Sequence, residues 1–131
     1  MFVFFSCSIP EKEQENPILQ LKAENYIPEL ADKLNEISGL MIYNNHLWGF
    51  NDSGGKNELY GFNKSGKIKY EIKLDNAQNE DWESITQNDK HIFVGDFGNN
   101  NGNRKNLCIY KIDKKDISDK GEQKVDVKEI E

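Results

Sequence analysis

Short apolar runs separated by turn residues make up most of the chain after residue 37. The runs are five to eight residues long, the length of β-strands. Asn44-Asn45, Asp52–Gly55 and Ser65-Gly66 lie between them, and Asn and Gly favour turns because they tolerate positive φ. The sequence therefore predicts strands at 38–43, 46–51, 58–63, 67–74, 83–87, 91–96, 107–112 and 124–130.

The first four predicted strands and the last four repeat the same pattern. At an offset of 45 the later residues match the earlier ones in both polar and apolar character, and beyond a longer loop the offset becomes 50. The matched pairs at 45 are Glu36/Asp81, Leu40/Ile85, His46/His91, Leu47/Ile92, Trp48/Phe93 and Asn51/Asp96, and those at 50 are Leu59/Ile109, Tyr60/Tyr110, Phe62/Ile112 and Asn63/Asp113.

A unit of about 45 residues with four short strands is typical of a β-propeller blade. Solenoid repeats usually include a helix or have a shorter period, and a sandwich does not require its loops to repeat. We therefore expect residues 26–131 to form an all-β fold of two four-stranded antiparallel blades, a partial propeller, with blade 1 at about 36–75 and blade 2 at about 81–131. Because closed propellers have about four to eight blades, two blades suggest a truncated piece, an assembly subunit or a marginally stable product.

The region before the strands differs in character. Residues 27–37 carry apolar side chains three and four positions apart, which predicts a helix, with an extended segment as the alternative. Residues 8–25 are rich in charge and lack periodicity, so they are interpreted as a flexible tether. Residues 1–7 end in Ser6-Cys7 after an apolar stretch and resemble the lipobox of bacterial lipoproteins, although no basic residue precedes Cys7. Cys7 is thus either a lipidation site at the end of a signal segment or a bystander.

Composition narrows the possible partners. The net charge is −6 and the lysines alternate with apolar or acidic residues, which argues against nucleic-acid binding. No stretch approaches the ~20 apolar residues of a membrane span, so a membrane would be contacted only through the lipid anchor. Of the two cysteines, Cys108 lies within an apolar run and is interpreted as a strand residue.

Acidic residues recur at the ends of the predicted strands. Carboxylate and amide oxygens are the ligands that Ca²⁺ prefers, and the ends of inner strands could meet at a channel mouth. The alternative is that these residues cap turns and accept hydrogen bonds from the backbone. The candidate metal ligands are Glu36, Asp52, Asp81, Glu83 and Asp96.

Four motifs, taken together, resemble a known family. Glu36–Leu40, Asn51–Gly55, Asp81–Ile85 and Gly95–Asn100 occur in the order and spacing found at the start of bacterial secreted six-bladed TolB-like β-propellers. The resemblance spans roughly residues 30–113 and implies an extracytoplasmic propeller of largely unassigned activity. A more distant likeness to esterase-like phytases and gluconolactonase-type propellers implies acidic channel residues that hold a divalent metal.

Two functions follow as expectations. The first is a binding or scaffold module at the cell envelope, with an unknown ligand or protein partner. The alternative is a metal-dependent hydrolase whose site would draw on Glu36, Asp52, Glu83 and Asp96. The sequence contains no nucleophile elbow around Ser53, because that motif requires the order Gly-x-Ser-x-Gly.

Overall fold

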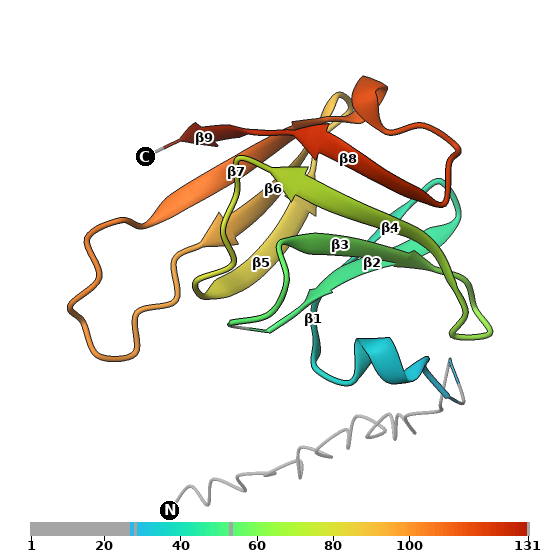
Figure 1. Cartoon of the computed structure of the whole chain (residues 1–131), viewed down its shortest axis with the longest axis horizontal. Helices are drawn as coiled ribbons and strands as arrows, with labels where there is room; N and C mark the ends of the chain where they lie inside the picture. The colour runs from blue at the N-terminus through green and yellow to red at the C-terminus, as the bar shows by residue number, and fades with distance from the viewer. Residues whose placement is uncertain (1–26, 28, 53, 131) are drawn as a thin grey trace, which may run out of the picture.

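The computed structural model describes residues 27, 29–52 and 54–130. The described residues are 51% strand, and the strands are arranged as two sheets (Figure 1). The predicted signal segment, the predicted tether and the candidate lipidation site Cys7 lie outside the described residues. The strands are β1 (Ile37–Tyr43), β2 (His46–Asn51), β3 (Glu58–Phe62), β4 (Ile68–Asp75), β5 (Trp82–Gln87), β6 (His91–Asp96), β7 (Cys108–Asp113), β8 (Glu122–Asp126) and β9 (Lys128–Ile130).

The first sheet has the order β1-β2-β3-β4-β8 and the second β5-β6-β7-β9. Within each sheet, consecutive strands up to β4 and β7 are antiparallel neighbours, as the two predicted meanders require. Asn44 and Asn45 have φ of 47° and 59° and join β1 to β2. Positive φ at both turn residues matches the right-handed twist of a hairpin. The all-β prediction is therefore confirmed, with two sheets of five and four strands that do not close into a ring.

The predicted last strand divides into two. β8 pairs in parallel with β4, whereas β9 pairs antiparallel with β7. Between these strands the backbone N–H of Val127 donates to the carbonyl of Asp75 at 3.4 Å, and the side chains of Val125 and Val127 are buried. The segment crosses from one sheet to the other because both valines fill the space between them.

The main core lies between the two sheets. It combines Trp48, Phe50 and Leu59 of the first sheet with Trp82 and Ile92 of the second. Phe50 meets Trp82 edge-on, with ring centroids 5.4 Å apart, a favoured aromatic geometry. β1 and β5 lie next to each other where the sheets meet. The sheets therefore pack face against face as one unit.

A second, smaller core covers the other face of the first sheet. There Leu34, Leu30 and Ile27 pack against Tyr60 and Phe62. The predicted helix at 27–37 is wrong in the part described, because the only helical turn there is the 3₁₀ turn η1 (Asp32–Leu34) and Ile37 begins β1. The N–H of Ala31 donates to the carbonyl of Gly66 at 3.3 Å rather than to a preceding helical turn. The apolar spacing thus serves to cover a sheet.

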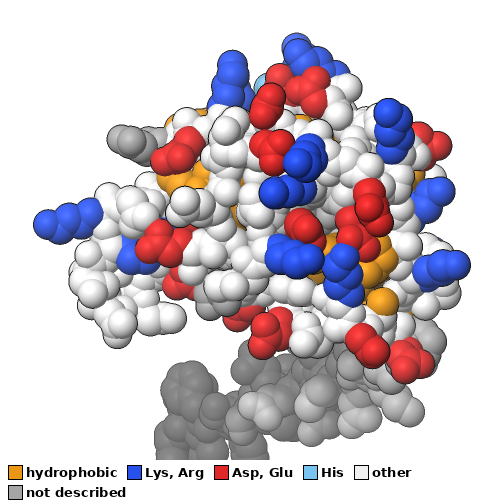
Figure 2. All heavy atoms as spheres, in the orientation of Figure 1, with side chains coloured by type: hydrophobic (Ala, Val, Ile, Leu, Met, Phe, Trp, Pro, Cys, Tyr) orange, Lys and Arg blue, Asp and Glu red, His pale blue; other side chains and the backbone are white. Residues whose placement is uncertain are grey.

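Figure 2 shows acidic and basic side chains intermingled over the face viewed, without a region of one sign. Among residues 27, 29–52 and 54–130, no helix has the length and apolar character that crossing a membrane requires.

Candidate functional site

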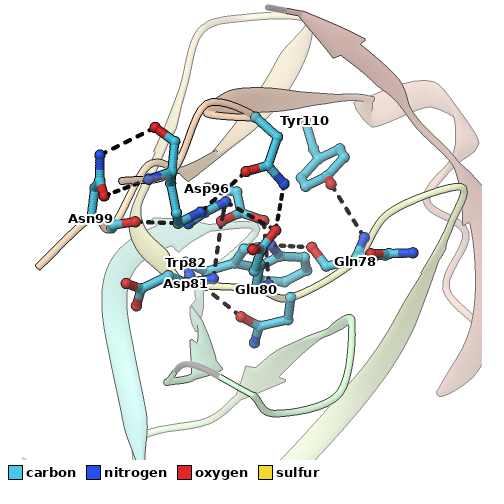
Figure 3. Close-up of polar contacts among 11 residues, drawn as sticks. Gln78, Glu80, Asp81, Trp82, Asp96, Asn99 and Tyr110 are labelled. Atoms are coloured by element: carbon cyan, nitrogen blue, oxygen red, sulfur yellow. Dashed lines mark hydrogen bonds and ion pairs between the residues drawn. The ribbon is translucent and has the colours of Figure 1, made fainter. Parts of the chain in front are cut away.

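The candidate site is centred on Asp96, at the end of β6. Asp96 is only 2% exposed, and it is the one buried charged residue in the described part of the chain. Asp81 and Glu80, just before β5, lie on one side of it, and the loop that follows β6 lies on the other (Figure 3). β5 and β6 are paired so that Trp82 is opposite Asp96. This pairing places the carboxylate against the backbone that enters β5.

Three donors satisfy the Asp96 carboxylate. Oδ1 accepts hydrogen bonds from the backbone N–H of Asp81 at 3.0 Å and from Nη2 of Arg104 at 2.8 Å. Oδ2 accepts one from the backbone N–H of Glu80 at 3.3 Å. A buried carboxylate is tolerated when it is paired and hydrogen-bonded. Asp96 therefore fixes the entry to β5 and anchors the following loop.

Arg104 is the second half of this arrangement and is the only arginine in the chain. Its side chain is 12% exposed, and Nη1 donates to the carbonyl of Gly98 at 2.8 Å while Nη2 also approaches Glu80 Oε2 at 3.4 Å. Burial opposes the charge, but the hydrogen bond and the negative charge of Asp96 raise the pKa of Arg104 above its ordinary value. The planar guanidinium thus connects three partners at once, which a lysine could not do with the same geometry.

Asparagine side chains give the 97–107 loop its shape. The N–H of Arg104 donates to Asn99 Oδ1 at 3.0 Å, and the N–H of Gly102 donates to the carbonyl of Asn99 at 2.9 Å. Asn106 Nδ2 donates to Glu80 Oε2 at 2.5 Å. Asparagine replaces backbone partners in this way in turns. The Gly/Asn-rich loop is consequently tied to the segment before β5 by Asn106 and Arg104, which contact Glu80, and by the N–H of Gly98, which donates to the carbonyl of Asp81 at 3.1 Å.

The segment before β5 is itself ordered by its neighbours. Asn79 Oδ1 accepts a hydrogen bond from the N–H of Trp82 at 3.3 Å, and its Nδ2 donates to the carbonyl of Asn51 at 3.0 Å. Trp82 Nε1 donates to the carbonyl of Gln78 at 2.8 Å. Asn79 therefore connects the end of β2 in the first repeat to the start of β5 in the second.

The sequence-predicted residues divide into two groups. Asp81 and Asp96 come together, and Gly98 lies so close to the Asp81 carboxyl that a Cβ at position 98 would overlap it. Glu36 and Asp52 are joined through their backbones, the N–H of Asp52 donating to the carbonyl of Glu36 at 3.0 Å. Glu83 is exposed on β5. In the part of the chain that the structure describes, no group of three or more His, Cys, Asp or Glu residues could hold a metal ion.

The first repeat uses Asn51 where the second uses Asp96. Asn51 Nδ2 donates to the carbonyl of Lys33 at 2.8 Å, so this amide holds the segment that covers the first sheet. Its Oδ1 is buried without a hydrogen-bond partner. The matched polar positions thus both anchor a neighbouring segment, although the segments differ. Sequence analysis missed Glu80, Asn79, Asn106 and Arg104; the single arginine in an otherwise lysine-rich chain was the available signal for the last of these.

An open polar pocket of about 370 Å³ lies beside Asp96. Tyr110 stands at its wall, and the Tyr110 hydroxyl oxygen accepts a hydrogen bond from the N–H of Gln78 at 3.3 Å. Burial raises the pKa of Tyr110 to about 12, so the hydroxyl keeps its proton at neutral pH. The pocket can accept small groups that donate hydrogen bonds, because its acidic lining includes Glu80, Asp96 and Glu129.

No protein-family model, curated protein or solved structure matches this chain.

Proposed function

We propose that this protein is a binding or scaffold module built from two blade-like repeats of the β-propeller type and located at the cell envelope. Support comes from the way in which the two sheets stack. Each sheet has two sides, here called the leading face and the trailing face. The leading face carries Leu47, Tyr60 and Phe62 in the first repeat and Ile92, Tyr110 and Ile112 in the second; the trailing face carries Trp48, Phe50 and Leu59 in the first and Phe93, Gly95 and Ile109 in the second.

The stacking joins unlike faces, and this single observation carries the proposal. The trailing face of the first sheet packs against the leading face of the second in one core. The leading face of the first sheet is instead covered by Leu30 and Leu34. Equivalent residues of the two repeats therefore have different neighbours, as in a head-to-tail row of blades. A sandwich of two repeats related by a two-fold axis would bury the same face of each.

The contacts of Asp96 favour a scaffold over a hydrolase. A metal would have to compete with Arg104 and with two backbone N–H groups for the same oxygens. The carboxylate that matches Asn51 in the repeat thus serves as an internal anchor, the alternative role that the sequence left open. In a metal-dependent hydrolase of the phytase or lactonase kind, Glu36, Asp52 and Glu83 would have to supply the remaining ligands.

Calorimetric titration with CaCl₂, combined with assays on p-nitrophenyl phosphate, phytate and gluconolactone, tests this function. A scaffold gives no saturable Ca²⁺ heat in the full chain and no turnover of these substrates above the buffer rate. MgCl₂ serves as the control for nonspecific ionic effects. Ca²⁺-dependent turnover that is lost in Asp52→Asn or Glu83→Gln would establish the hydrolase instead.

A further inference from the structure

The trailing face of the second sheet is apolar and open. Ile109 is 39% exposed and Ile130 is 44% exposed, and they lie opposite each other on β7 and β9. Ile109 is also opposite Gly95 on β6. The neighbours of Ile109 along β7, Cys108 and Tyr110, are buried in the core, and successive strand residues point to opposite faces. The exposed residues therefore form one continuous surface on the far side of the second sheet from the first.

Phe97 completes this surface. Phe97 is 44% exposed, and its ring lies over Gly95, where a Cβ would overlap it. In the first repeat the residue that matches Gly95 is Phe50, which is fully buried against Trp82. Both trailing faces thus present a phenyl ring at the same place. In the first repeat another sheet covers the ring, whereas in the second none of the described residues does.

We propose that the trailing face of the second sheet is a docking surface for a further four-stranded antiparallel sheet of the same repeat. The inference rests on the proposed blade-like function and identifies its partner. The occupant presents a leading face, with one aromatic and two aliphatic or aromatic side chains at the positions of Ile92, Tyr110 and Ile112. The interface within this chain supplies the template, because the first trailing face is covered by such a face.

Charge at the edge of the surface fits this occupant. Lys111 and Lys128 are opposite each other on β7 and β9 and share the side of the sheet that Ile109 and Ile130 occupy. The leading side of the first sheet carries acids, because Glu58 accepts a hydrogen bond from Tyr60 at 2.7 Å and Glu71 forms an ion pair with Lys33. A repeat with acids at these positions would bring opposite charges together.

An unaltered second copy of the chain does not meet this requirement. The leading face of its first sheet is already covered by Leu30 and Leu34, and the leading face of its second sheet lies inside the main core. The occupant is therefore a repeat whose leading face has no such cover.

The test extends the full chain by one repeat. A second copy of residues 36–75 is appended after Glu131 through a copy of residues 76–81, the segment that connects the first sheet to the second. The original chain remains intact, so its own folding does not depend on the added sheet. Docking predicts a single urea-unfolding transition with a higher midpoint and a roughly one-third larger m value, since m scales with the surface exposed on unfolding.

Two variants of the extended chain separate docking from other effects. Ile109→Lys should abolish the gain in midpoint and m value, whereas Ile42→Lys should retain it, since Ile42 is an apolar residue of β1 that is 68% exposed away from this surface. An unchanged m value together with rapid proteolytic removal of the added sheet would overturn the proposal. So would an equal gain in the Ile109→Lys form.

Sedimentation analysis of the chain without the extra repeat tests whether a second copy of the chain occupies this surface. A dimer that Ile109→Lys dissociates would make a second copy the occupant and would also overturn the proposal. The calcium and turnover assays do not involve this surface, so failure of the docking test leaves the scaffold function standing.

Discussion

Replacing Asp96 with alanine tests whether the candidate site is a structural anchor. The substitution removes the acceptor for Arg104 and for the backbone N–H groups of Asp81 and Glu80. Breaking a buried ion pair by removing one partner costs about 3–5 kcal/mol, and a buried donor left without an acceptor costs about 1–3 kcal/mol. We expect the free energy of unfolding to fall by about 3–5 kcal/mol, a large share of the ~5–15 kcal/mol typical of a domain.

Urea unfolding followed by tryptophan fluorescence measures this loss, since Trp82 is fully buried next to the site. Asp96→Asn should lose less, about 1–3 kcal/mol, because the amide oxygen still serves some of the donors. Asp96→Leu combined with Arg104→Met should recover part of the loss, since well-packed apolar side chains can replace a buried pair. Glu83→Ala is the matched control: this exposed acid should change stability by less than about 0.5 kcal/mol.

A loss below about 1 kcal/mol in Asp96→Ala, on the scale of an ordinary surface change, would refute the anchor. The structural-anchor role would also be refuted if millimolar Ca²⁺ stabilised the unaltered protein but not the Asp96 variants. That result would show that the Asp96 carboxylate binds a metal.

Three further predictions concern other parts of the molecule. Burial raises the pKa of Tyr110 to about 12, and burial together with Glu58 raises the pKa of Tyr60 further. The stabilisation from these shifts should therefore be complete below the unfolded-state pKa of about 10 and should decline as the pH rises toward 12. Tyr110→Phe should flatten this decline in thermal scans. A flat profile between pH 9 and 12 would contradict it. Gly61→Ala should lower the free energy of unfolding by about 1–3 kcal/mol, because the added Cβ would lie 2.9 Å from the rings of both Trp48 and Tyr70. Gly54→Ala is the comparison in the same urea assay. Its Cβ would meet no atom within 4 Å, so this variant tests the effect of backbone φ strain alone. Cys7→Ala should move the protein from the membrane to the soluble fraction of fractionated cells if Cys7 is lipidated; unchanged fractionation would remove the lipid anchor.

The strands were predictable because their signals are local. Short apolar runs and the Asn and Gly turns between them placed seven of the predicted strands at their positions in the structure to within a residue or so. The prediction of the eighth strand was wrong because Val125 and Val127 are buried in the space between the two sheets. The apolar pattern does not show which sheet each part of such a segment pairs with. The helix predicted at 27–37 was wrong for a related reason. Apolar residues three and four positions apart also suit a segment that covers the face of a sheet.

The site was predictable only where the repeat marked it. The match of Asn51 with Asp96, and of Glu36 with Asp81, directed attention to strand ends, and the structure brings Asp81 and Asp96 of that set together. Arg104 has no counterpart in the first repeat, because it lies in the loop that lengthens the offset from 45 to 50 residues. Its role depends on a loop geometry that the asparagines create in three dimensions, so the pairing with Asp96 could not be inferred from spacing.

The crossing segment formed by β8 and β9 also has a consequence for synthesis of the protein. β4 can complete its hairpin with β3 as soon as both strands have left the ribosome, but its outer edge stays unpaired until Glu122–Asp126 has been made. During that interval β4 exposes free backbone groups, a template for joining strands of other chains. Lys69, Glu71 and Lys73, which alternate along β4, are residues of the kind that discourage such pairing. The nascent chain thus carries its own protection against aggregation while the strand that closes the first sheet is still being translated.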